Sequence, residues 1–291
     1  MIAPEGGERP LRAKAYAKLN LTLDILDRRP DGYHDLRMIM QRIDLADELT
    51  LTAAEGPGRM DTNLSYLPAD GRNLAQQAAA AFRSAAGLGG PVDIAIEKHI
   101  PVCAGLGGGS ADAAAVLLAM NELTGAGLSP AQLAEIGAAV GSDVPFCVQG
   151  GTALAEGRGE RLTPLPPLPP CWITVCKPHF SISTPQLFAQ ADSRRITCRP
   201  DTGGMLRALE SGDLTGVARR VYNVFEDVLE PRRRGEVDAI KAVLVDCGAL
   251  GASMSGSGPT VFGIFAGQDS AAAALRRLRG QYRDVFLTRP L

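Results

Sequence analysis

Residues 101–111 combine the residue types that bind phosphate in proteins. The segment reads Pro101-Val102-Cys103-Ala104-Gly105-Leu106-Gly107-Gly108-Gly109-Ser110-Ala111 and runs directly into an apolar stretch that predicts a helix over 112–120. Unpaired N–H groups at a helix N-terminus and the positive end of the helix dipole favour anions. The lysine that a Walker-type loop carries after its last glycine is absent, because Ser110 is followed by alanine. The segment therefore predicts a phosphate site of another kind.

A second group of polar residues lies near the start of the chain, in the alternating segment 17–25. Lys18 and Asn20 are two residues apart, so on a strand both side chains project from one face. This pattern fits either a functional polar face or simple exposure to solvent. The turn that follows carries Tyr33 and His34, which fit either a platform for a flat heterocycle or ordinary surface.

Two further segments carry small and polar residues. Gly251-Ala252-Ser253-Met254-Ser255-Gly256-Ser257-Gly258-Pro259 would let two backbones approach closely and offer hydroxyl and N–H groups to a ligand, or would be a flexible surface loop. In Gly141-Ser142-Asp143-Val144-Pro145-Phe146 the proline argues against a continuing helix. We therefore expect Asp143 at a helix-to-loop junction.

The elements that must position these residues are mixed strands and helices. Alternating or short apolar runs predict strands at 19–25, 36–44, 92–96, 172–176 and 261–265, and helices are expected at 73–86, 112–120, 129–140, 235–247 and 270–279. Since strands and helices do not alternate strictly, the pattern favours an α+β fold. Five prolines within 164–170 predict a stiff linker between a first domain, 1–163, and a second, 171–291.

The composition excludes several classes of protein. The 291 residues have 45% hydrophobic residues and a net charge of −2, so no general attraction to nucleic acid or to an anionic membrane is expected. No apolar stretch has the length of a membrane span, and the first twelve residues lack a signal-peptide core. The six cysteines and three histidines show no metal-like spacing. We expect a cytoplasmic protein with reduced thiols and no metal bound by side chains.

Taken together, five segments resemble the GHMP kinases, a superfamily of small-molecule kinases. The superfamily pattern Pro-x-x-x-Gly-Leu-Gly-[Ser/Gly]-[Ser/Gly]-Ser is met by residues 101–110, and the other matching segments are 17–21, 31–34, 141–146 and 254–258. The resemblance extends from about residue 14 to about residue 265, and residues 1–12 and 194–204 match nothing. Asp-Gly-Tyr-His and Ser-Asp-Val-Pro-Phe are similar to one branch, whose alcohol substrate carries a cytidine diphosphate group.

The resemblance implies a fold and an activity. The fold would combine a ribosomal-S5-like N-terminal domain with a ferredoxin-like C-terminal domain, with the active site in the cleft between them. The activity would be ATP-dependent phosphorylation of the 2-hydroxyl of a cytidine-diphosphate-linked methylerythritol, in the non-mevalonate isoprenoid pathway. Partners would be ATP, with Mg²⁺ as its counter-ion, and this small-molecule substrate. The oligomeric state stays open between a monomer and a homodimer.

The resemblance also implies roles for single residues. Asp143 and Lys18 would act on the attacking hydroxyl. Residues Pro101 to Ala111 would hold the ATP phosphates, and Lys98 would lie near the nucleotide, unless it is an exposed strand lysine. Tyr33 and Phe188 would enclose the cytosine ring and His34 would hydrogen-bond it, while Asn20 and Thr184 would contact the diphosphate and methylerythritol region.

Three other functions are compatible with parts of the sequence. The first is another GHMP kinase, of the homoserine or mevalonate type, although those substrates have no base for the Tyr33–His34 turn to contact. The second is a catalytically silent nucleotide-binding sensor, which the presence of both Asp143 and Lys18 argues against. The third is a structural protein that binds no nucleotide.

Overall fold

A computed structural model describes residues 10–291 of the chain. These residues form two compact units. The first unit is made of residues 10–16, 46–100 and 108–149, and the second of residues 17–45, 101–107 and 150–291. Residues 101–111, called the glycine segment below, are therefore divided between the two units after residue 107. The first nine residues of the domain expected over 1–163 lie outside the described part.

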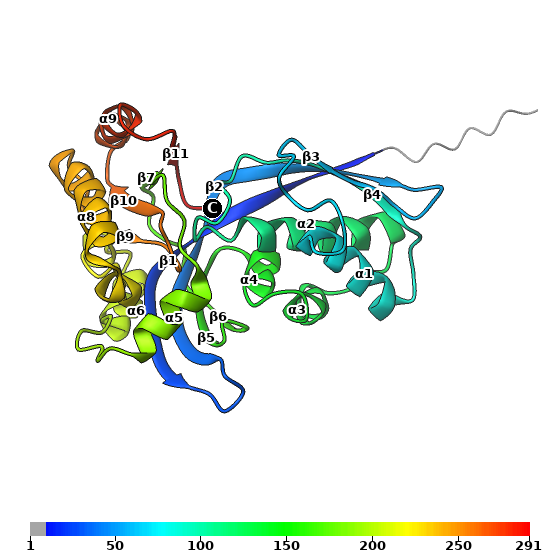
Figure 1. The fold of residues 1–291 in the computed structure, drawn as a ribbon, viewed down its shortest axis with the longest axis horizontal. Helices are drawn as coiled ribbons and strands as arrows, with labels where there is room; N and C mark the ends of the chain where they lie inside the picture. The colour runs from blue at the N-terminus through cyan, green and yellow to red at the C-terminus, as the bar shows by residue number, and fades with distance from the viewer. Residues whose placement is uncertain (1–9) are drawn as a thin grey trace, which may run out of the picture. The chain divides into compact units, whose positions relative to one another are not determined.

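The first unit packs helices against one side of a small sheet (Figure 1). Strand β4 pairs in parallel with β3 and antiparallel with the second half of β2, with Glu97 opposite Glu48. The elements are β3 (Met60–Thr62), α1 (Leu74–Ala86), β4 (Val92–Glu97), α2 (Gly108–Thr124), α3 (Pro130–Ala138), α4 (Val144–Gln149) and parts of the long strands β1 (Leu11–Arg28) and β2 (His34–Ala53).

Helix α2, which follows the glycine segment, forms the core of this unit. Its side chains are buried almost all the way round, from Ala111 through Leu117 to Met120. The many alanines allow α1, α3 and α4 to pack closely around it. The body of α2 is thereby fixed by packing, whereas its first turn is open, since Gly109 is exposed and Gly108 and Ser110 are half-buried.

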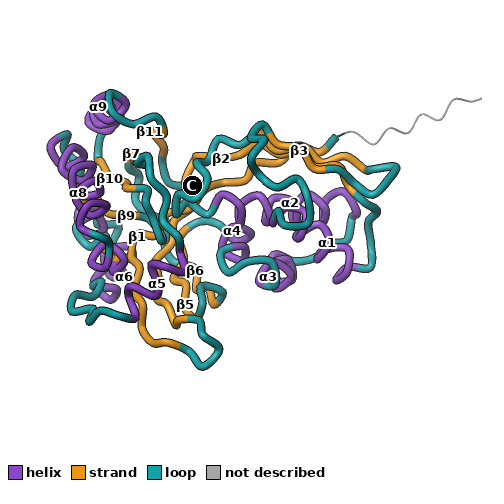
Figure 2. The backbone as a smooth tube through the Cα atoms, viewed as in Figure 1, coloured by secondary structure: helices purple, strands orange, loops and turns teal. Residues whose placement is uncertain are grey.

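The second unit contains an antiparallel sheet in the order β11-β7-β10-β9, with α8 and α9 on one side of it (Figure 2). Its elements are β5 (Thr152–Gly157), β6 (Arg161–Pro164), β7 (Trp172–Lys177), α5 (Thr184–Asp192), α6 (Thr202–Glu210), α7 (Leu214–Ala218), β8 (Tyr222–Asn223), a 3₁₀ helix (Val224–Val228), α8 (Pro231–Asp246), β9 (Gly251–Met254), β10 (Val261–Phe265), α9 (Gln268–Arg279) and β11 (Asp284–Thr288).

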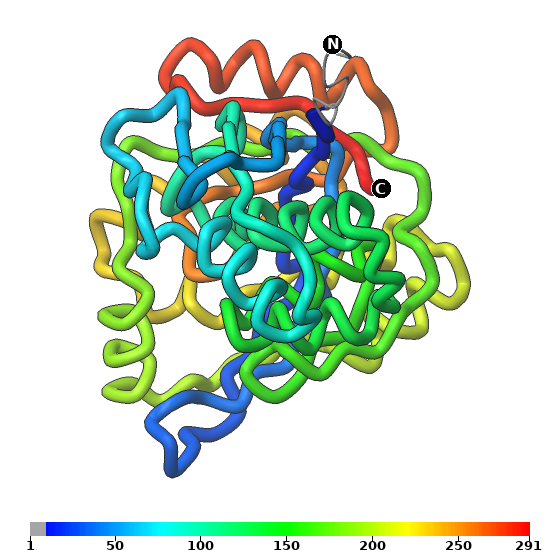
Figure 3. The backbone as a smooth tube through the Cα atoms, turned by 90° about the vertical axis from the view of Figure 1, so that its right-hand side faces the viewer, coloured from blue at the N-terminus to red at the C-terminus, as the bar shows by residue number. Residues whose placement is uncertain are grey.

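Strand pairing in the second unit brings distant parts of the chain together. Every residue of β10 is buried, and α9 runs back beside β11 (Figure 3). The first half of β2 pairs with β5, and β1 pairs in parallel with β8, where Leu23 lies opposite Asn223. The last pairing sets Asn223 beside the strand that carries Lys18 and Asn20.

Most of the predicted elements are confirmed. Asn73 and Gly87 cap α1 at the two ends of the helix expected at 73–86, and Ser129 forms a capping box with Gln132 at the start of the helix expected at 129–140. The mixed arrangement confirms an α+β fold. Strands β5 and β11 and helices α6 and α7 had not been predicted. None of the helices in the described part of the chain is long and apolar enough to cross a bilayer.

The prediction for Asp143 is wrong about the side on which the adjoining helix lies. We expected Asp143 at the end of a helix because Pro145 follows it, whereas Asp143 directly precedes α4. A proline is well suited to the first turn of a helix, because its fixed φ is helical and the N–H that it lacks would have no partner there. Pro145 therefore begins a new helix instead of ending the previous one.

Candidate active site

Residues 101–107, the part of the glycine segment that belongs to the second unit, are fixed by hydrogen bonds to their carbonyl groups. The bonds join Thr260 N to Ala104 O (3.3 Å), Ser255 Oγ to Gly105 O (3.0 Å) and Lys18 N to Leu106 O (3.0 Å). Three successive carbonyl oxygens thus accept from β1 and from the segment 255–260, all within the second unit. The segment is therefore held in one conformation by two separate parts of the chain.

Gly105 lies where two backbone segments touch. Its φ is +77°, and a Cβ added to it would lie 2.2 Å from the carbonyl oxygen of Ser255. A Cβ on Gly256 would lie 3.0 Å from the carbonyl oxygen of Gly105. Only glycine allows both the positive φ and the close backbone contact at position 105. The predicted close approach of two backbones is confirmed, and the alternative of a flexible surface loop is wrong, since residues 253–256 are buried.

Two buried polar residues that the sequence analysis did not name hold the same segment. They are Asn223, whose Nδ2 donates to the carbonyl oxygens of Met254 and Gly256 (both 2.8 Å), and Glu226, whose carboxylate accepts from Ser253 Oγ (2.7 Å), Met254 N (2.8 Å) and Lys241 Nζ (2.5 Å). Each is at most 5% exposed. The available signal was the presence of an amide and two adjacent acidic residues, Glu226 and Asp227, among the apolar residues of 223–229.

Lys18 and Asn20 face the interior of the second unit, not solvent. The two side chains are 4% and 1% exposed, and Lys18 Nζ donates to Asn20 Oδ1 at 2.6 Å. The side chain of Lys18 also runs past the glycine segment, because a Cβ on Gly107 would lie 3.0 Å from Lys18 Cγ. Of the alternatives left open by the sequence, simple exposure to solvent is wrong for this pair.

A buried ammonium with two carboxylates lies at the start of α2 in the first unit. Lys98 Nζ donates to Asp47 Oδ2 at 2.5 Å and to Asp112 Oδ2 at 2.6 Å. The three side chains are at most 5% exposed. Lys98 is therefore not an exposed strand lysine. Its implied place near the nucleotide stays a prediction, with its ammonium group already held by two acids.

Asp112 has an altered acidity in this cluster. Burial raises the pKa of Asp112 to about 7; the nearby Lys98 ammonium lowers this pKa and the Asp47 carboxylate raises it further. The second carboxyl oxygen, Oδ1, is buried and has no hydrogen-bond partner. Between about pH 4 and pH 7 the folded protein keeps a proton that the unfolded chain has lost, so this group lowers the free energy of unfolding as the pH rises.

Asp112→Asn is therefore expected to gain stability relative to the parent as the pH rises. The difference between the two free energies of unfolding should move in favour of the variant by at least about 1 kcal/mol from pH 5 to pH 8, since one pKa unit corresponds to about 1.4 kcal/mol. Urea unfolding followed by circular dichroism measures it. Glu135→Gln on the exposed face of α3 is the control. If the difference in free energy of unfolding between Asp112→Asn and the parent did not change with pH, the raised pKa of Asp112 would be contradicted.

Asp143 belongs to the turn between α3 and α4. Its carbonyl oxygen accepts from Cys147 N at 3.1 Å, which begins the hydrogen bonding of α4. The same turn lies beside the start of α2, because a Cβ on Gly141 would be 3.7 Å from Ser110 Oγ. Asp143 and the serine of the glycine segment are thus carried by neighbouring parts of the first unit, while Lys18 is carried by the second.

His34 is buried between an acid and an aromatic ring. His34 Nε2 lies 2.7 Å from Asp192 Oδ1, and the imidazole stacks on Phe188 with ring centroids 4.6 Å apart and an interplanar angle of 14°. Phe188 and Asp192 are four residues apart on α5, so both project from one face of the helix. That spacing is the signal by which Asp192 could have been found once Phe188 had been named.

Tyr33 and Thr184 lie in different surroundings. Tyr33 is 56% exposed, and the guanidinium of Arg158 lies 5.0 Å from its ring centroid. The structure thus pairs Phe188 with His34, and Tyr33 with Arg158. Thr184 Oγ1 lies 2.8 Å from Ser257 Oγ, which joins the start of α5 to the segment that supports Gly105.

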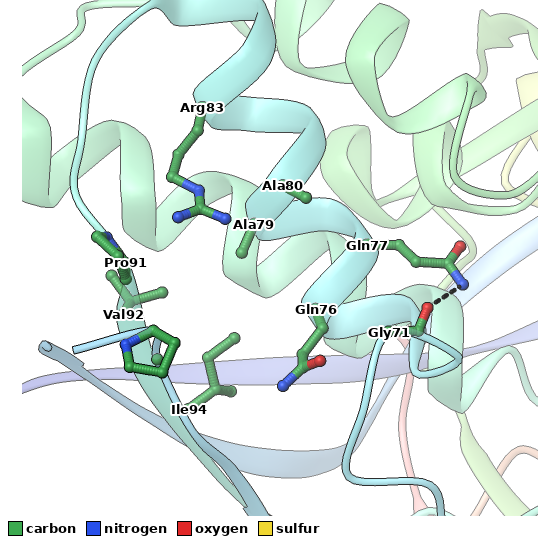
Figure 4. Close-up of a pocket in the computed structure, with 11 residues that line it drawn as sticks. Gly71, Gln76, Gln77, Ala79, Ala80, Arg83, Pro91, Val92 and Ile94 are labelled. Carbon is green, nitrogen blue, oxygen red and sulfur yellow. Dashed lines mark hydrogen bonds between the residues drawn. The ribbon is translucent and has the colours of Figure 1, made fainter.

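A separate cavity of about 250 Å³ opens between α1 and β4 in the first unit (Figure 4). Arg83 of α1 points toward Pro91 and Val92, and Gln77 Nε2 donates to the carbonyl oxygen of Gly71 at 3.0 Å. None of the residues named from the sequence as site residues lines this cavity. It is distinct from the candidate site.

Known proteins resemble the chain in sequence along almost its whole length. The model of the GHMP kinase N-terminal domain matches residues 73–151, and that of the GHMP kinase C-terminal domain matches residues 205–284. A 4-diphosphocytidyl-2-C-methyl-D-erythritol kinase of Exiguobacterium sibiricum is 48% identical over 279 residues, which are 96% of this chain and 97% of the relative.

Solved structures agree with these matches. The crystal structure of a 4-(cytidine 5'-diphospho)-2C-methyl-D-erythritol kinase has a TM-score of 0.78 and 35% identity, covering 96% of this chain and 99% of that one. A homoserine kinase from Cytophaga hutchinsonii has a TM-score of 0.75 at 21% identity, covering 99% of this chain and 97% of its own. The second similarity shows the fold alone, and both confirm the predicted GHMP kinase architecture.

Proposed function

Because this chain belongs to the GHMP kinases, in the family of the 4-diphosphocytidyl-2-C-methyl-D-erythritol kinases, we propose that it phosphorylates 4-diphosphocytidyl-2-C-methyl-D-erythritol. The phosphoryl group of ATP would be transferred to the 2-hydroxyl, as a cytoplasmic step of the non-mevalonate isoprenoid pathway. The observation that carries this proposal is the 48% identity over 279 residues. A match of that length includes all five segments on which the candidate site is built.

Residues 101–111 would hold the phosphates of ATP. The local structure supports this role, because neighbouring side chains leave little room for a Cβ at two of its glycines. A Cβ on Gly107 would lie 3.0 Å from Lys18 Cγ, and one on Gly108 would lie 3.1 Å from Ile100 Cγ2. What remains is backbone N–H groups and the N-terminus of α2, which suit anionic oxygens. Mg²⁺ would accompany ATP, and we assign no protein ligand to it.

Asp143 and Lys18 would act at the attacking hydroxyl. An alcohol is far less acidic than an aspartic acid of pKa about 3.9, so Asp143 cannot remove its proton early. Phosphoryl transfer has a loose transition state in which positioning and charge stabilisation dominate. Asp143 would orient the hydroxyl and accept its proton late, while Lys18 would keep the carboxylate ionised and offset negative charge.

The cytidine end of the substrate would bind near α5. Phe188 and Tyr33 would enclose the base, with Arg158 beside the exposed ring of Tyr33. His34 would hydrogen-bond the base, with Asp192 holding its Nε2. Asn20 and Thr184 would contact the diphosphate and methylerythritol region, and both already touch the segment 255–257.

A homoserine or mevalonate kinase would need no base-binding residues. The exposed ring of Tyr33 and the half-buried ring of Phe188, with His34 beside it, would supply such residues for an aromatic base. A nucleotide-binding sensor would need neither Asp143 nor Lys18.

Competition by cytidine nucleotides separates these functions. We expect CDP to inhibit phosphorylation of the alcohol competitively with respect to that substrate, and UDP to inhibit at least about 10-fold less well, because the hydrogen-bonding groups of a buried site reject a mismatched base. A coupled assay that follows ADP release measures both. Homoserine and mevalonate are the control substrates. Phosphorylation of either one at a higher kcat/KM than the cytidine substrate would overturn the proposal.

A further inference from the structure

Asp47 ties down the residues that lead into the glycine segment. Its Oδ1 accepts the backbone N–H groups of His99 (2.5 Å) and Ile100 (2.8 Å), and its Oδ2 accepts from Lys98 Nζ (2.5 Å). Asp47 is fully buried and lies 51 residues before Lys98 in the sequence. One carboxylate thus fixes three consecutive residues that end immediately before Pro101.

Lys98 links Asp47 to the other end of the glycine segment, where α2 begins. Its ammonium group also donates to Asp112, in the N-terminal part of α2, at 2.6 Å. Gly108, the first residue of α2, packs on the same group, since a Cβ there would lie 3.1 Å from Ile100 Cγ2 and 3.5 Å from Lys98 Nζ. The residues before and after the glycine segment are therefore joined inside one unit.

We propose that Asp47, Lys98 and Asp112 form a clasp that fixes the separation of the two ends of the glycine segment and so sets its affinity for ATP. The three are positioning residues, which act on the nucleotide through the backbone of residues 101–108. This inference rests on the proposed function in one respect, that ATP is the ligand of the segment.

A restraint on both ends matters because of the way in which a glycine-rich segment binds its ligand. Four glycines give the segment many conformations, and a ligand held by several backbone N–H groups needs one of them. Inside the second unit the segment is held by the three carbonyl hydrogen bonds described above. The clasp supplies the corresponding restraint at residues 98–100 and 108–112 in the first unit, where its buried charges have little freedom to move.

Asp112→Ala opens the clasp at one end. It leaves the Lys98–Asp47 pair intact, so no buried charge loses its only partner, and alanine suits this helix. We expect the Kd of ATP, measured by calorimetry without the alcohol substrate, to rise at least about 10-fold, the scale on which displaced positioning groups act. The KM of the alcohol should stay within about 2-fold, since its proposed contacts are elsewhere.

Three further variants show whether positioning, and not stability, is responsible. Asp112→Asn keeps an oxygen that accepts from Lys98 and should bind ATP within about 3-fold of the parent. The double variant Asp47→Asn, Lys98→Met opens the clasp from the other side, leaves Asp112 as a buried acid whose raised pKa favours the neutral form, and should weaken ATP binding as Asp112→Ala does. Phe82→Leu, in the buried face of α1, is the control for lost stability.

The results that would overturn the clasp are specific. One is an ATP Kd for Asp112→Ala and for the double variant equal to that of the parent. Another is an equal loss of ATP affinity in Phe82→Leu at a matched decrease in Tm. Failure of the proposed function would instead appear in the parent, as ATP binding without phosphorylation of the cytidine substrate. The two failures are therefore distinguishable.

Discussion

Replacing Asp143 with asparagine is expected to lower kcat by about 10³-fold, within the range of about 10² to 10⁴ that a proton-accepting side chain contributes. Asparagine has nearly the same shape and can still contact the hydroxyl, but it cannot accept its proton. The KM values of ATP and of the alcohol should therefore change by less than about 3-fold. Steady-state kinetics with both substrates varied, together with a thermal unfolding curve, measures the effect.

Ser142→Ala is the matched control for this prediction, since it alters the neighbouring side chain of the same turn and keeps the carboxylate. It should retain kcat within about 5-fold. A kcat for Asp143→Asn within a few-fold of the parent, with an unchanged Tm, would mean that the carboxylate does not accept the proton. The residue would then be a structural part of the turn before α4.

Gly105→Ala is expected to disrupt the glycine segment more strongly than any other single methyl group added to it. The residue has φ of +77°, and the new Cβ would lie 2.2 Å from the carbonyl oxygen of Ser255. The left-handed conformation alone costs about 1–2 kcal/mol for an alanine, and forcing two backbones apart adds about 1–3 kcal/mol. We expect the Kd of ATP to rise at least about 10-fold and the Tm to fall.

Gly151→Ala separates the cost of the left-handed backbone conformation from the cost of the collision with Ser255. Gly151 has a similar φ of +69° and nothing within 4 Å of an added Cβ, so its alanine variant carries the backbone cost without the collision. We expect a loss of about 1–2 kcal/mol in the free energy of unfolding and an unchanged Kd for ATP. If Gly105→Ala and Gly151→Ala lost equal stability and both bound ATP normally, the contact between Gly105 and Ser255 would have no role in the site.

The local features of the site could be predicted from the sequence because they depend on neighbouring residues. Glycines 105, 107, 108 and 109 before an alanine-rich stretch predicted a loop that leads into a helix, and α2 begins at Gly108; phosphate binding by this loop stays a prediction. Ser129 and Gln132 specify the start of α3 in the same way. The small residues of 251–259 indicated a close backbone approach, although not that Gly105 is the partner.

The partners that support these features could not be predicted, because they are distant in sequence. Asp47 meets Ile100 across 53 residues, and His34 meets Asp192 across 158. A buried carboxylate has no periodicity of its own, and only the fold decides which donors surround it. For the same reason Lys18 fitted a solvent-exposed face when only its alternation with leucines was known.

The helix that begins after Asp143 could not be predicted, for a different reason. Proline interrupts a helix and also begins one, so Pro145 alone could not decide between a helix end and a helix start. The packing of Gly137 against Val144, where an added Cβ would lie 2.6 Å from Val144 Cγ1, decides it by bringing α3 and α4 together. Asp143 consequently lies before α4, in the turn whose Gly141 approaches Ser110.

Phosphorylation of the 2-hydroxyl of 4-diphosphocytidyl-2-C-methyl-D-erythritol by this chain can be observed directly. The protein is incubated with ATP, Mg²⁺ and this alcohol, and the reaction is followed by phosphorus NMR. We expect a new phosphomonoester resonance that grows in step with ADP, while the diphosphate resonances of the acceptor are kept. ATP and acceptor that remain unchanged, or ADP formed with inorganic phosphate and no new ester, would contradict it.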